Sequence, residues 1–279
     1  MLKLHHMDLK NKTISVIVPA YNEEKTIESV VKALLLSKYF KEIICINDGS
    51  KDKTLDILKG FKNKIILVDL KENKGKGYAM VEGIKKTNSE LIMFLDADFT
   101  NLSNIHIETL LKPILEENYR IVMGYLLNPY NENTKNLASE LTGQRVYYRE
   151  DLLPYLEKMS TVRFGIEVLL NDIFKNIPTK KLPLKNLRGL YKYEKFNSKE
   201  ALKEYIKEVV EIAKVIGKKN GLIKEDYQIL TNISNSKDLD DLEVKSKNIK
   251  NTKLKEFFDR YLIKYLQIGK HNNKEENIT

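Results

Sequence analysis

The amino-acid sequence predicts an α/β protein in which helices flank a mostly parallel, doubly wound central sheet and a helical appendage follows. Short apolar segments alternate with helical segments up to about residue 126, and this alternation is typical of parallel sheets. From Ser198 onward the composition shifts toward helix-forming residues with a helical apolar stripe. We therefore expect one large sheet-containing domain followed by a smaller helical part.

Length and composition agree with this division. The chain has 279 residues, of which 42% are hydrophobic and 31% charged, as in globular proteins with a substantial core. Its one cysteine, Cys45, lies in an apolar run and is expected to be a buried thiol. No apolar run reaches the length of a membrane span, and the first residues, with His5 and His6, lack the apolar core of a signal peptide. We expect a cytoplasmic protein, with peripheral contact to the inner face of the membrane as an alternative.

The strands of the first half are expected at residues 13–19, 42–47, 64–69, 91–95 and 121–126, where apolar and β-branched residues concentrate. The helices between them are expected around residues 27–35, 55–58, 78–86 and 103–118. Asn22 is a candidate N-cap for the first helix, and Ser50 or Asp52 for the second.

The segment 91–95 ends in two carboxylates, Asp96 and Asp98, one residue apart. In an extended chain, positions two apart point to the same side, so both side chains can face one point at the carboxyl end of the strand. Open α/β sheets bind ligands at that edge, and two hard oxygen donors there suit Mg²⁺ or Mn²⁺ shared with substrate phosphates. The alternative is that Asp98 only caps the helix that begins near Ser103.

The loop 72–77 is basic and glycine-rich, and it leads into a helix. Such a loop brings backbone amides and the Lys76 ammonium close to phosphate groups. It matches neither the dinucleotide-binding glycine pattern nor a Walker loop, which disfavours dehydrogenases and ATPases.

The order is less regular after residue 126. Residues 141–149 precede a short helix near Asp151, and residues 163–170 open a helix that runs to about Asn176. Glu167 falls in the first turn of that helix, where a surface acid that stabilises the helix dipole is the alternative to a functional role.

The appendage is expected to contain three helices: one ended by Gly217, one at 223–233, and one that carries Leu254 and Phe258 and stops near Gly269. Residues 234–241 are expected to be a linker, and the tail from His271 is expected to be disordered. Three arrangements of the appendage are weighed: packing on the domain, pairing with a second copy and lying on a membrane. Packing or a homodimer is favoured, because its polar faces mix both charge signs.

The net charge of +9 is unevenly placed, since eight basic residues and one acid lie between Lys175 and Lys199. This indicates a local anionic partner, and no nucleic-acid recognition motif accompanies it. A solvated basic face is the alternative. We assign Arg188, inside this segment, to the binding of an anionic acceptor, because its fork can grip two oxygens.

Four motifs in order resemble the family 2 glycosyltransferases with the GT-A (Rossmann-like) fold: residues 16–24 (VIVPAYNEE), Asn47–Asp48–Gly49–Ser50 with Asp52 and Thr54, residues 73–77 (NKGKG) and Asp96–Ala97–Asp98. The resemblance implies a catalytic domain over 13–197, divided into a nucleotide-sugar-binding half (13–100) and an acceptor half (101–197). Residues 1–12 would be an extension, 198–270 the appendage and 271–279 the tail.

The resemblance also implies roles for individual residues. Asp48 would read the base, commonly uracil, Lys76 would lie near the ribose and diphosphate, and Asp98, with Asp96 beside it, would hold the divalent metal. The implied donor-binding residues are Pro19, Ala20, Tyr21, Glu23, Asp48, Lys76, Asp96 and Ala97.

A second pair of motifs, Thr142–Gly143–Gln144–Arg145 and Phe164–Gly165–Ile166–Glu167, is similar to the branch that includes glucosyl-3-phosphoglycerate synthases. In that branch the glutamate helix borders the acceptor pocket, and we assign Gly143 and Arg145 to acceptor binding as well. A histidine after a Pro-Leu strand supplies a further metal ligand there. Here Gly189 stands at that place.

These observations predict a metal-dependent glycosyltransferase that moves a hexose-type sugar from a nucleotide diphosphate donor, with a UDP-sugar favoured, to an anionic or hydroxyl acceptor. The acceptor would be a phosphorylated or carboxylated small molecule or a polyprenyl phosphate, in cell-envelope glycan or small glycoside synthesis. Glu167 would be the general base in an inverting mechanism, or would anchor the acceptor in a retaining one that uses the donor phosphate as base.

Two other functions are weighed against this one. A non-catalytic sugar-nucleotide-binding protein on the same fold is supported by Gly189 in place of histidine. A nucleotidyltransferase is disfavoured, because the place of its glycine-rich basic loop after the first strand holds Pro19–Ala20–Tyr21–Asn22.

Overall fold

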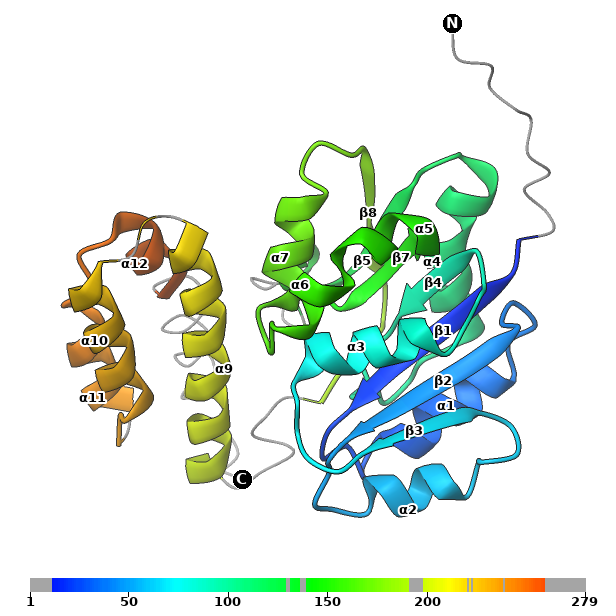
Figure 1. Ribbon diagram of the computed structural model, residues 1–279, viewed down its shortest axis with the longest axis horizontal. Helices are drawn as coiled ribbons and strands as arrows, with labels where there is room; N and C mark the ends of the chain where they lie inside the picture. The colour runs from blue at the N-terminus through cyan, green and yellow to red at the C-terminus, as the bar shows by residue number, and fades with distance from the viewer. Residues whose placement is uncertain are drawn as a thin grey trace, which may run out of the picture. The chain divides into compact units, whose positions relative to one another are not determined.

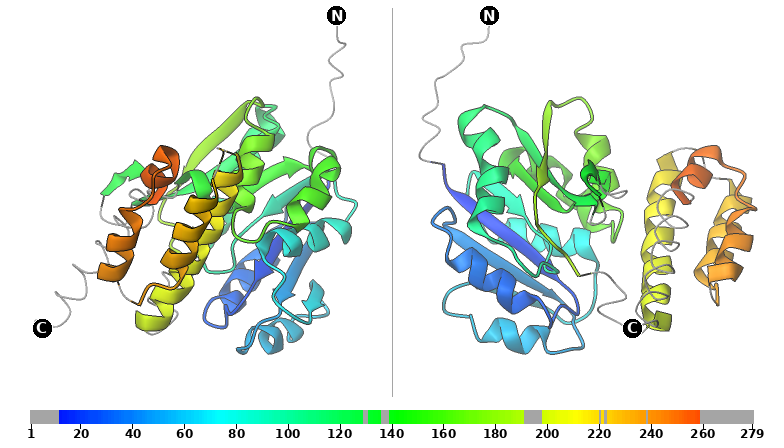
Figure 2. Two further views of the ribbon diagram at one scale, coloured as in Figure 1. Left: turned by 60° about the vertical axis from the view of Figure 1, so that its left-hand side comes forward. Right: turned by 180° about the vertical axis from the view of Figure 1, so that it is seen from behind.

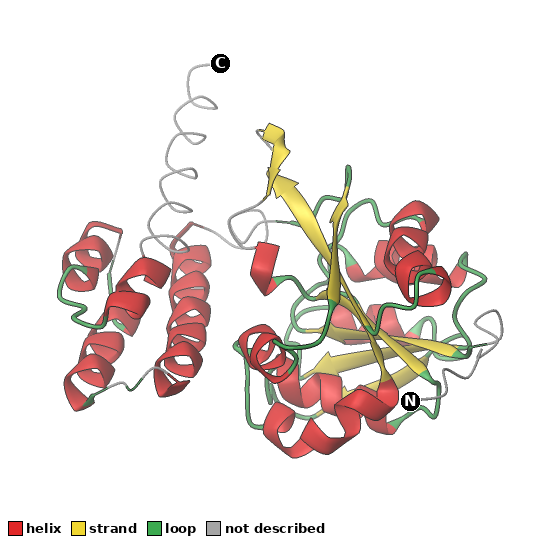
Figure 3. Ribbon diagram, turned by 90° about the horizontal axis from the view of Figure 1, so that it is seen from above, coloured by secondary structure: helices red, strands yellow, loops and turns green. Residues whose placement is uncertain are grey.

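The computed structural model describes residues 12–128, 131–135, 139–190, 198–219, 221, 223–237 and 239–258. The chain forms two compact units, each continuous in space but not in sequence. One comprises Met1–Arg163 and Ile173–Gly189 and contains the sheet (Figure 1). The other comprises Phe164–Asp172 and Leu190–Thr279, and its described part consists of helices and connecting loops (Figure 3). The segment that carries Glu167 thus belongs to the helical unit, while the predicted domain boundaries stay a prediction.

The strands form one mixed sheet in the order β3-β2-β1-β4-β7-β5-β6, with β8 paired to β5. Their bounds are β1 Ile14–Ala20, β2 Glu42–Asp48, β3 Ile66–Leu70, β4 Leu91–Phe94, β5 Ile121–Asn128, β6 Asn131–Lys135, β7 Gln144–Tyr148 and β8 Thr179–Leu184. Strands β3, β2, β1 and β4 run parallel, as do β5 and β8, whereas β7 is antiparallel to both β4 and β5. The predicted mostly parallel sheet with flanking helices is confirmed.

Strand β7 was not predicted. Its segment holds Gln144 and Arg145, and both are buried, at 2% and 1% exposure. An apolar run is what reveals a buried strand in a sequence, so two buried polar side chains conceal this one.

Helices cover both faces of the sheet, as Figure 1 and the rear view in Figure 2 show. On one face, Val16 and Val18 of β1 belong to a core shared with α1, α2 and α4, while α3 packs on β1 and β2. Because β1 is buried on both sides, its sequence is almost continuously apolar. The helices of this unit are α1 Ile27–Leu35, α2 Thr54–Lys59, α3 Lys76–Lys85, α4 Asn104–Glu116, α5 Arg149–Leu152 and α6 Leu156–Ser160, with short 3₁₀ turns at Ser139–Leu141 and Leu153–Tyr155.

The structure corrects three predictions of helix caps. Helix α2 begins at Thr54 with Lys53 at the N-cap position, so neither Ser50 nor Asp52 stands there. Helix α1 begins at Ile27 with Thr26 as N-cap, so Asn22 does not cap it. Asn22 instead has a left-handed backbone (φ 56°) in the preceding loop. Helix α4 is capped by Ser103, whose N–H donates to His106 Nδ1 at 3.1 Å, so the alternative in which Asp98 caps it is wrong.

The helical unit contains α9 Ser198–Lys219, α10 Lys224–Ser234, α11 Leu239–Ser246 and α12 Thr252–Phe258, together with most of α7 Ile166–Ile173. Helix α9 packs on α10 and α12, and Gly165 at the start of α7 lies against Val215 of α9.

Two expectations for the helical unit are wrong. Gly217 does not end α9, because glycine tolerates helical dihedrals, and α11 begins inside the expected linker. The predicted remainder of the last helix, from 259 to Gly269, the tail from His271, and His5 and His6 lie outside the described residues. In the part of the chain that the structure describes, no helix has the length and apolar character needed to cross a membrane. The homodimer stays a prediction.

A buried polar cluster joins the amino ends of β1 and β2 to the segment before β4. Ser15 Oγ donates to Glu42 Oε2 at 2.6 Å and lies 2.8 Å from Thr87 Oγ1, and the Thr87 hydroxyl also contacts Glu42. Burial alone would raise the pKa of Glu42. The hydrogen bonds from Ser15 and Thr87, with the charge of Lys41, outweigh it and lower the pKa below its ordinary value of 4.5.

We predict that Glu42→Gln lowers the free energy of unfolding by about 1 kcal/mol at neutral pH and that the difference from wild type shrinks on acidification. A carboxyl whose pKa is lowered by folding stabilises the folded state above about pH 4.5 and loses that contribution as the pH falls through its folded pKa. Urea unfolding between neutral pH and about pH 3 measures this. Glu28→Gln on the exposed side of α1 is the control, and a pH-independent difference for Glu42→Gln would contradict the account.

Candidate functional site

The candidate site lies at the carboxyl edge of the parallel strands, where the loops after β1, β2, β3 and β4 come together. The β1 and β2 loops are bonded to each other directly. The Asn22 N–H donates to Ser50 Oγ at 3.0 Å, and Asn22 Oδ1 accepts the Lys51 N–H at 2.8 Å. The Glu23 N–H donates to Thr54 Oγ1 at 2.8 Å. The first two sequence motifs are therefore one structural feature, even though about 25 residues separate them.

Asp48, at the end of β2, holds the glycine-rich loop. Its Oδ1 accepts the Lys74 N–H at 2.7 Å and its Oδ2 accepts the Gly75 N–H at 2.9 Å, and the residue is 3% exposed. Burial raises the pKa of the Asp48 carboxyl, although the two N–H groups and the Arg163 charge oppose that shift. Both oxygens thus have a loop-anchoring role, and base reading by Asp48 stays a prediction.

Arg163 holds the same loop from the other side, and the sequence analysis missed it. Its guanidinium donates to the Asn73 carbonyl at 3.2 Å and also contacts Asn73 Oδ1, while its own carbonyl accepts the Gly77 N–H at 3.3 Å. Gly75 has φ +98°, and a Cβ there would lie 2.7 Å from Arg163 Cγ. Glycine is therefore required at position 75 for two reasons: other residues rarely adopt this φ, and a side chain would clash with Arg163. The only sequence signal was that Arg163 directly precedes the Phe164–Glu167 motif.

Lys76 is the first residue of α3 and reaches the end of β4. Its Nζ lies 2.6 Å from Asp96 Oδ1, and both side chains are partly exposed. A cation at the amino end of a helix is unfavourable next to the helix dipole, so the Asp96 carboxylate offsets a charge that would otherwise destabilise this turn. Positive charge and backbone amides at one helix end are also what an anionic ligand needs.

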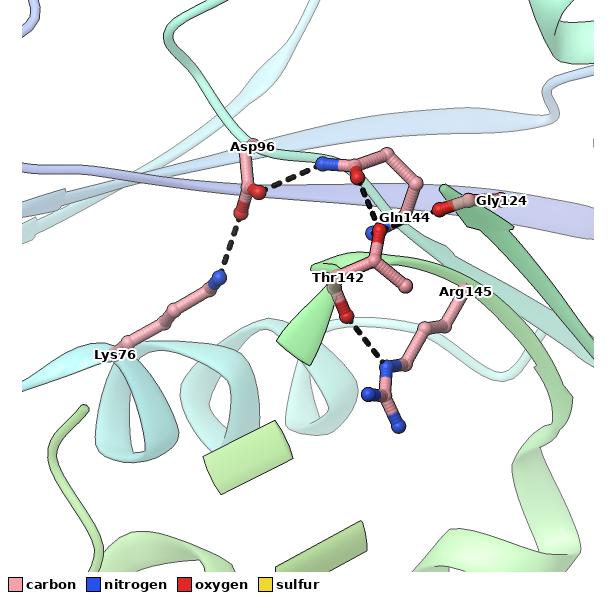
Figure 4. A network of polar contacts seen from close by, with 6 residues as sticks. All are labelled: Lys76, Asp96, Gly124, Thr142, Gln144 and Arg145. Atoms are coloured by element: carbon pink, nitrogen blue, oxygen red, sulfur yellow. Dashed lines mark hydrogen bonds and ion pairs between the residues drawn. The ribbon is translucent and has the colours of Figure 1, made fainter. Parts of the chain in front are cut away.

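Asp96 is bonded on its other oxygen to Gln144 of β7, as Figure 4 shows. Gln144 Nε2 donates to Asp96 Oδ2 at 2.6 Å. A Cβ at Gly143 would overlap the Asp96 carboxylate, so only glycine lets the backbone approach this closely. Gln144 belongs to the Thr142–Arg145 motif, but no local pattern assigns it to the site, because its contact to Asp96 spans 48 residues.

Gly143 and Arg145 were both assigned to the acceptor. The structure brings Gly143 to Asp96, and it places Arg145 inside β7 with 1% exposure. Arg145 Nε donates to the Thr142 carbonyl at 2.7 Å, and its two other nitrogens donate to Tyr147 Oη at 3.2 Å and to the Glu140 carbonyl at 3.3 Å. These bonds support the strand, and the acceptor roles of both residues stay predictions.

Asp98 faces the segment after β8. Phe99 forms an isolated bridge with Gly189, and a Cβ added at Gly189 would lie 3.5 Å from Asp98 Oδ1. Arg188 is exposed, and its backbone is fixed by the Thr100 N–H at 3.0 Å and by Asn101 Oδ1 at 2.9 Å. A side chain at 189 would therefore stand beside Asp98, and the assignment of this position to a metal-ligating histidine stays a prediction.

The residues present fit a divalent cation that is shared with a bound ligand. Within the described ranges, no group of three or more histidine, cysteine, aspartate and glutamate side chains could hold a metal alone. Asp96 already accepts bonds on both oxygens, from Lys76 and Gln144. Asp98 is the other candidate ligand, and Mg²⁺-type sites commonly use one or two carboxylates together with substrate phosphates.

The other predicted residues are placed as follows. Ala20 and Ala97 are buried, whereas Pro19, Tyr21 and Glu23 are half-buried near the end of β1. Glu167 lies in the helical unit and is 7% exposed, so it is not a surface acid, and its catalytic role stays a prediction.

Part of the basic segment is paired with acids. Lys180 Nζ lies 3.0 Å from Glu117, and Lys181 Nζ lies 2.6 Å from Glu140. These two lysines therefore have structural partners. Lys192, Lys195 and the side chain of Lys199 lie outside the described residues.

Comparison with known proteins gives a family and a fold. The family model described as "Glycosyl transferase family 2" matches residues 15–177. Poly-beta-1,6-N-acetyl-D-glucosamine synthase of Staphylococcus aureus (strain COL) is 46% identical over 88 residues, 30% of this chain and 21% of that protein. The synthase of Staphylococcus epidermidis is 41% identical over 101 residues, 35% of this chain and 24% of that protein. The chain therefore spans about a quarter or less of these relatives.

Among solved structures, glucosyl-3-phosphoglycerate synthase from Mycobacterium tuberculosis resembles the chain with a TM-score of 0.51 and 24% identity, over 64% of this chain and 72% of that one. That structure is a complex with Mn²⁺, UDP and glucosyl-3-phosphoglycerate. A second structure of the same enzyme, with Mg²⁺ and UDP, matches equally, with a TM-score of 0.51. At this identity the similarity shows the fold, which is the GT-A fold.

We predict that Asp48→Asn loosens the loop after β3. An asparagine offers one acceptor oxygen where the carboxylate offers two, so the Lys74 or the Gly75 N–H loses its partner. Hydrogen exchange of these two amides should accelerate about tenfold or more, because a bond to a charged acceptor contributes about 1.5–3 kcal/mol. Asp56→Asn on exposed α2 is the matched control. Unchanged protection of both amides would show that Asp48 does not hold the loop.

Proposed function

The chain belongs to glycosyl transferase family 2, and from that premise we propose that it is a metal-dependent glycosyltransferase that moves a hexose-type sugar from a nucleotide diphosphate donor to an anionic or hydroxyl acceptor. One observation carries this proposal: the Asp96 carboxylate at the end of β4 pairs with Lys76 at the amino end of α3, and a second carboxylate, Asp98, follows two residues later. Cation, amides and carboxylates at one sheet edge suit a diphosphate together with a divalent metal. A UDP-sugar is the favoured donor, supported by the UDP complexes of the structural neighbour.

On the donor side, each residue has a physical task. Lys76 and the first amides of α3 attract the diphosphate, while Asp48 and Arg163 fix the loop that presents them. Asp98 is the proposed metal ligand. A bound Mg²⁺ or Mn²⁺ neutralises the negative charge that develops on the leaving diphosphate. Because Lys76 and the bound metal would both face the leaving diphosphate with positive charge, this group needs no proton donor.

On the acceptor side, we assign Arg188 and Glu167. Arg188 is exposed in the segment next to Asp98, where it can pair with a phosphate or carboxylate. Glu167 would accept the proton of the attacking hydroxyl in an inverting mechanism, or would orient the acceptor in a retaining one. A phosphorylated or carboxylated small molecule and a polyprenyl phosphate both suit these groups, in the cytoplasm or at the inner face of the membrane. Both proposed acceptors are small or lipid-linked molecules, and we propose no nucleic-acid partner.

A second candidate function is sugar-nucleotide binding without catalysis. Gly189 favours it, because the position beside Asp98 carries no side chain that could ligate a metal. Binding of a donor without transfer to any acceptor and without slow donor hydrolysis would distinguish this function from the first.

We predict that UDP-sugars raise the melting temperature only when Mn²⁺ or Mg²⁺ is present, and that Asp98→Asn lowers kcat at least about 100-fold. The amide keeps the size of the side chain but removes the charge that holds the cation. Thermal shift and donor hydrolysis are the measurements, with Asp56→Asn as control. Full activity of Asp98→Asn, or of wild type in excess chelator, would refute the metal role.

We predict that Gly189→His lowers the Mn²⁺ concentration needed for half-maximal rate roughly fivefold, which corresponds to about 1 kcal/mol of metal-binding free energy. An imidazole at this position would start beside Asp98 Oδ1 and could add a nitrogen ligand. Gly189→Leu, of comparable bulk without a ligand atom, is the matched control. If both variants behave alike, position 189 is not part of the metal site.

We predict that Arg188→Ala raises the acceptor KM about tenfold while donor affinity and donor hydrolysis stay nearly constant, because the guanidinium is proposed to bind the anionic acceptor and not the donor. Initial rates at varied acceptor and donor concentrations give the two effects separately. Lys185→Ala, in the same exposed turn, is the control. A collapse of donor binding would instead assign Arg188 to the diphosphate.

A further inference from the structure

The Asp96 carboxylate is held from two sides by groups of different chemistry. Lys76 contributes a charge from α3, at 2.6 Å from Oδ1, and Gln144 contributes a neutral N–H from β7, at 2.6 Å from Oδ2 (Figure 4). Lysine reaches this point on a long, flexible side chain that is partly exposed. Gln144 reaches it from a strand and is 2% exposed. The rigid partner of Asp96 is therefore Gln144.

The orientation of the Gln144 amide is itself fixed. Its Oε1 lies against the Thr142 hydroxyl, which is also in contact with the Gly124 carbonyl of β5. Because a carboxylate oxygen only accepts hydrogen bonds, the NH₂ group must face Asp96 and the carbonyl must face Thr142. Gly143, between these two residues, has no side chain to keep Asp96 away. The turn 142–144 is thus shaped around this one carboxylate.

We propose that Gln144 is a positioning residue for the donor diphosphate. By holding Asp96, it keeps the Lys76 ammonium at the amino end of α3, so that charge and helix amides meet a diphosphate together. This inference rests on the proposed function, because a diphosphate donor is what the Lys76 site would bind. Without the Gln144 N–H, the Asp96 carboxylate loses its rigid partner and can turn about its own Cβ–Cγ bond. Lys76 would then lose its fixed position beside the diphosphate, while contacts to the base would not change.

The test compares two ligands that differ only in the diphosphate. Calorimetry measures the affinity of the full chain, with Mn²⁺ present, for UDP and for uridine. The variants are Gln144→Leu, which removes the amide, and Gln144→Glu, which keeps length and shape but replaces the N–H donor by an acceptor. Gln228→Leu, on the exposed side of α10, is the control, and each variant's melting temperature shows that it is folded.

We expect both Gln144 variants to bind UDP about tenfold more weakly than wild type and to bind uridine equally well. In turnover, the donor KM should rise and the acceptor KM should stay constant. Equal losses for UDP and uridine would mean general damage to the pocket and would overturn the inference. So would unchanged UDP binding by the folded Gln144→Glu protein. If wild type itself binds neither UDP nor a UDP-sugar, the proposed function fails first and this inference fails with it.

Discussion

The Asp96 carboxylate, at the end of a strand buried on both faces, is the constraint around which the site is built. A charge at that position needs partners, and two segments supply them: Lys76 comes from α3 and Gln144 from β7, where Gly143 leaves room for the carboxylate. These contacts join the parallel half of the sheet to its antiparallel strand. The same contacts leave a lysine at a helix amino end, which is the arrangement that a diphosphate requires.

Aspartates at this edge have three different physical roles, although the residue type is the same. Asp48 is buried and uses both oxygens to hold the Lys74 and Gly75 amides, so it shapes a loop. Asp96 is compensated by a cation and an amide, so it positions Lys76. Asp98 lies beside Gly189, and it is the carboxylate for which we propose the metal role. The difference lies in what neighbouring strands place opposite each side chain.

Much of the fold could be predicted from the sequence because β1, β2 and β4 are apolar runs buried on both faces, and the helices between the strands have apolar stripes. Strand β7 was missed because its buried residues include Gln144 and Arg145, whose burial depends on distant partners. In the site, Asp96, Asp98 and Lys76 were found through local spacing. Gln144 and Arg163 were not assigned, because their contacts cross 48 and 90 residues of sequence, and no local pattern reports such pairs. The cap predicted at Gly217 was wrong because glycine also tolerates helical dihedrals, and α9 continues to Lys219.

The central claim is that a divalent cation binds at the end of β4 together with a nucleotide diphosphate. The most direct measurement is an anomalous difference map from crystals of the protein grown with Mn²⁺ and UDP. The account predicts a manganese peak within about 2.0–2.6 Å of an Asp98 carboxylate oxygen, with the diphosphate between the metal and the amino end of α3. UDP bound at this edge without manganese at Asp98, or manganese and UDP bound elsewhere on the chain, would contradict it.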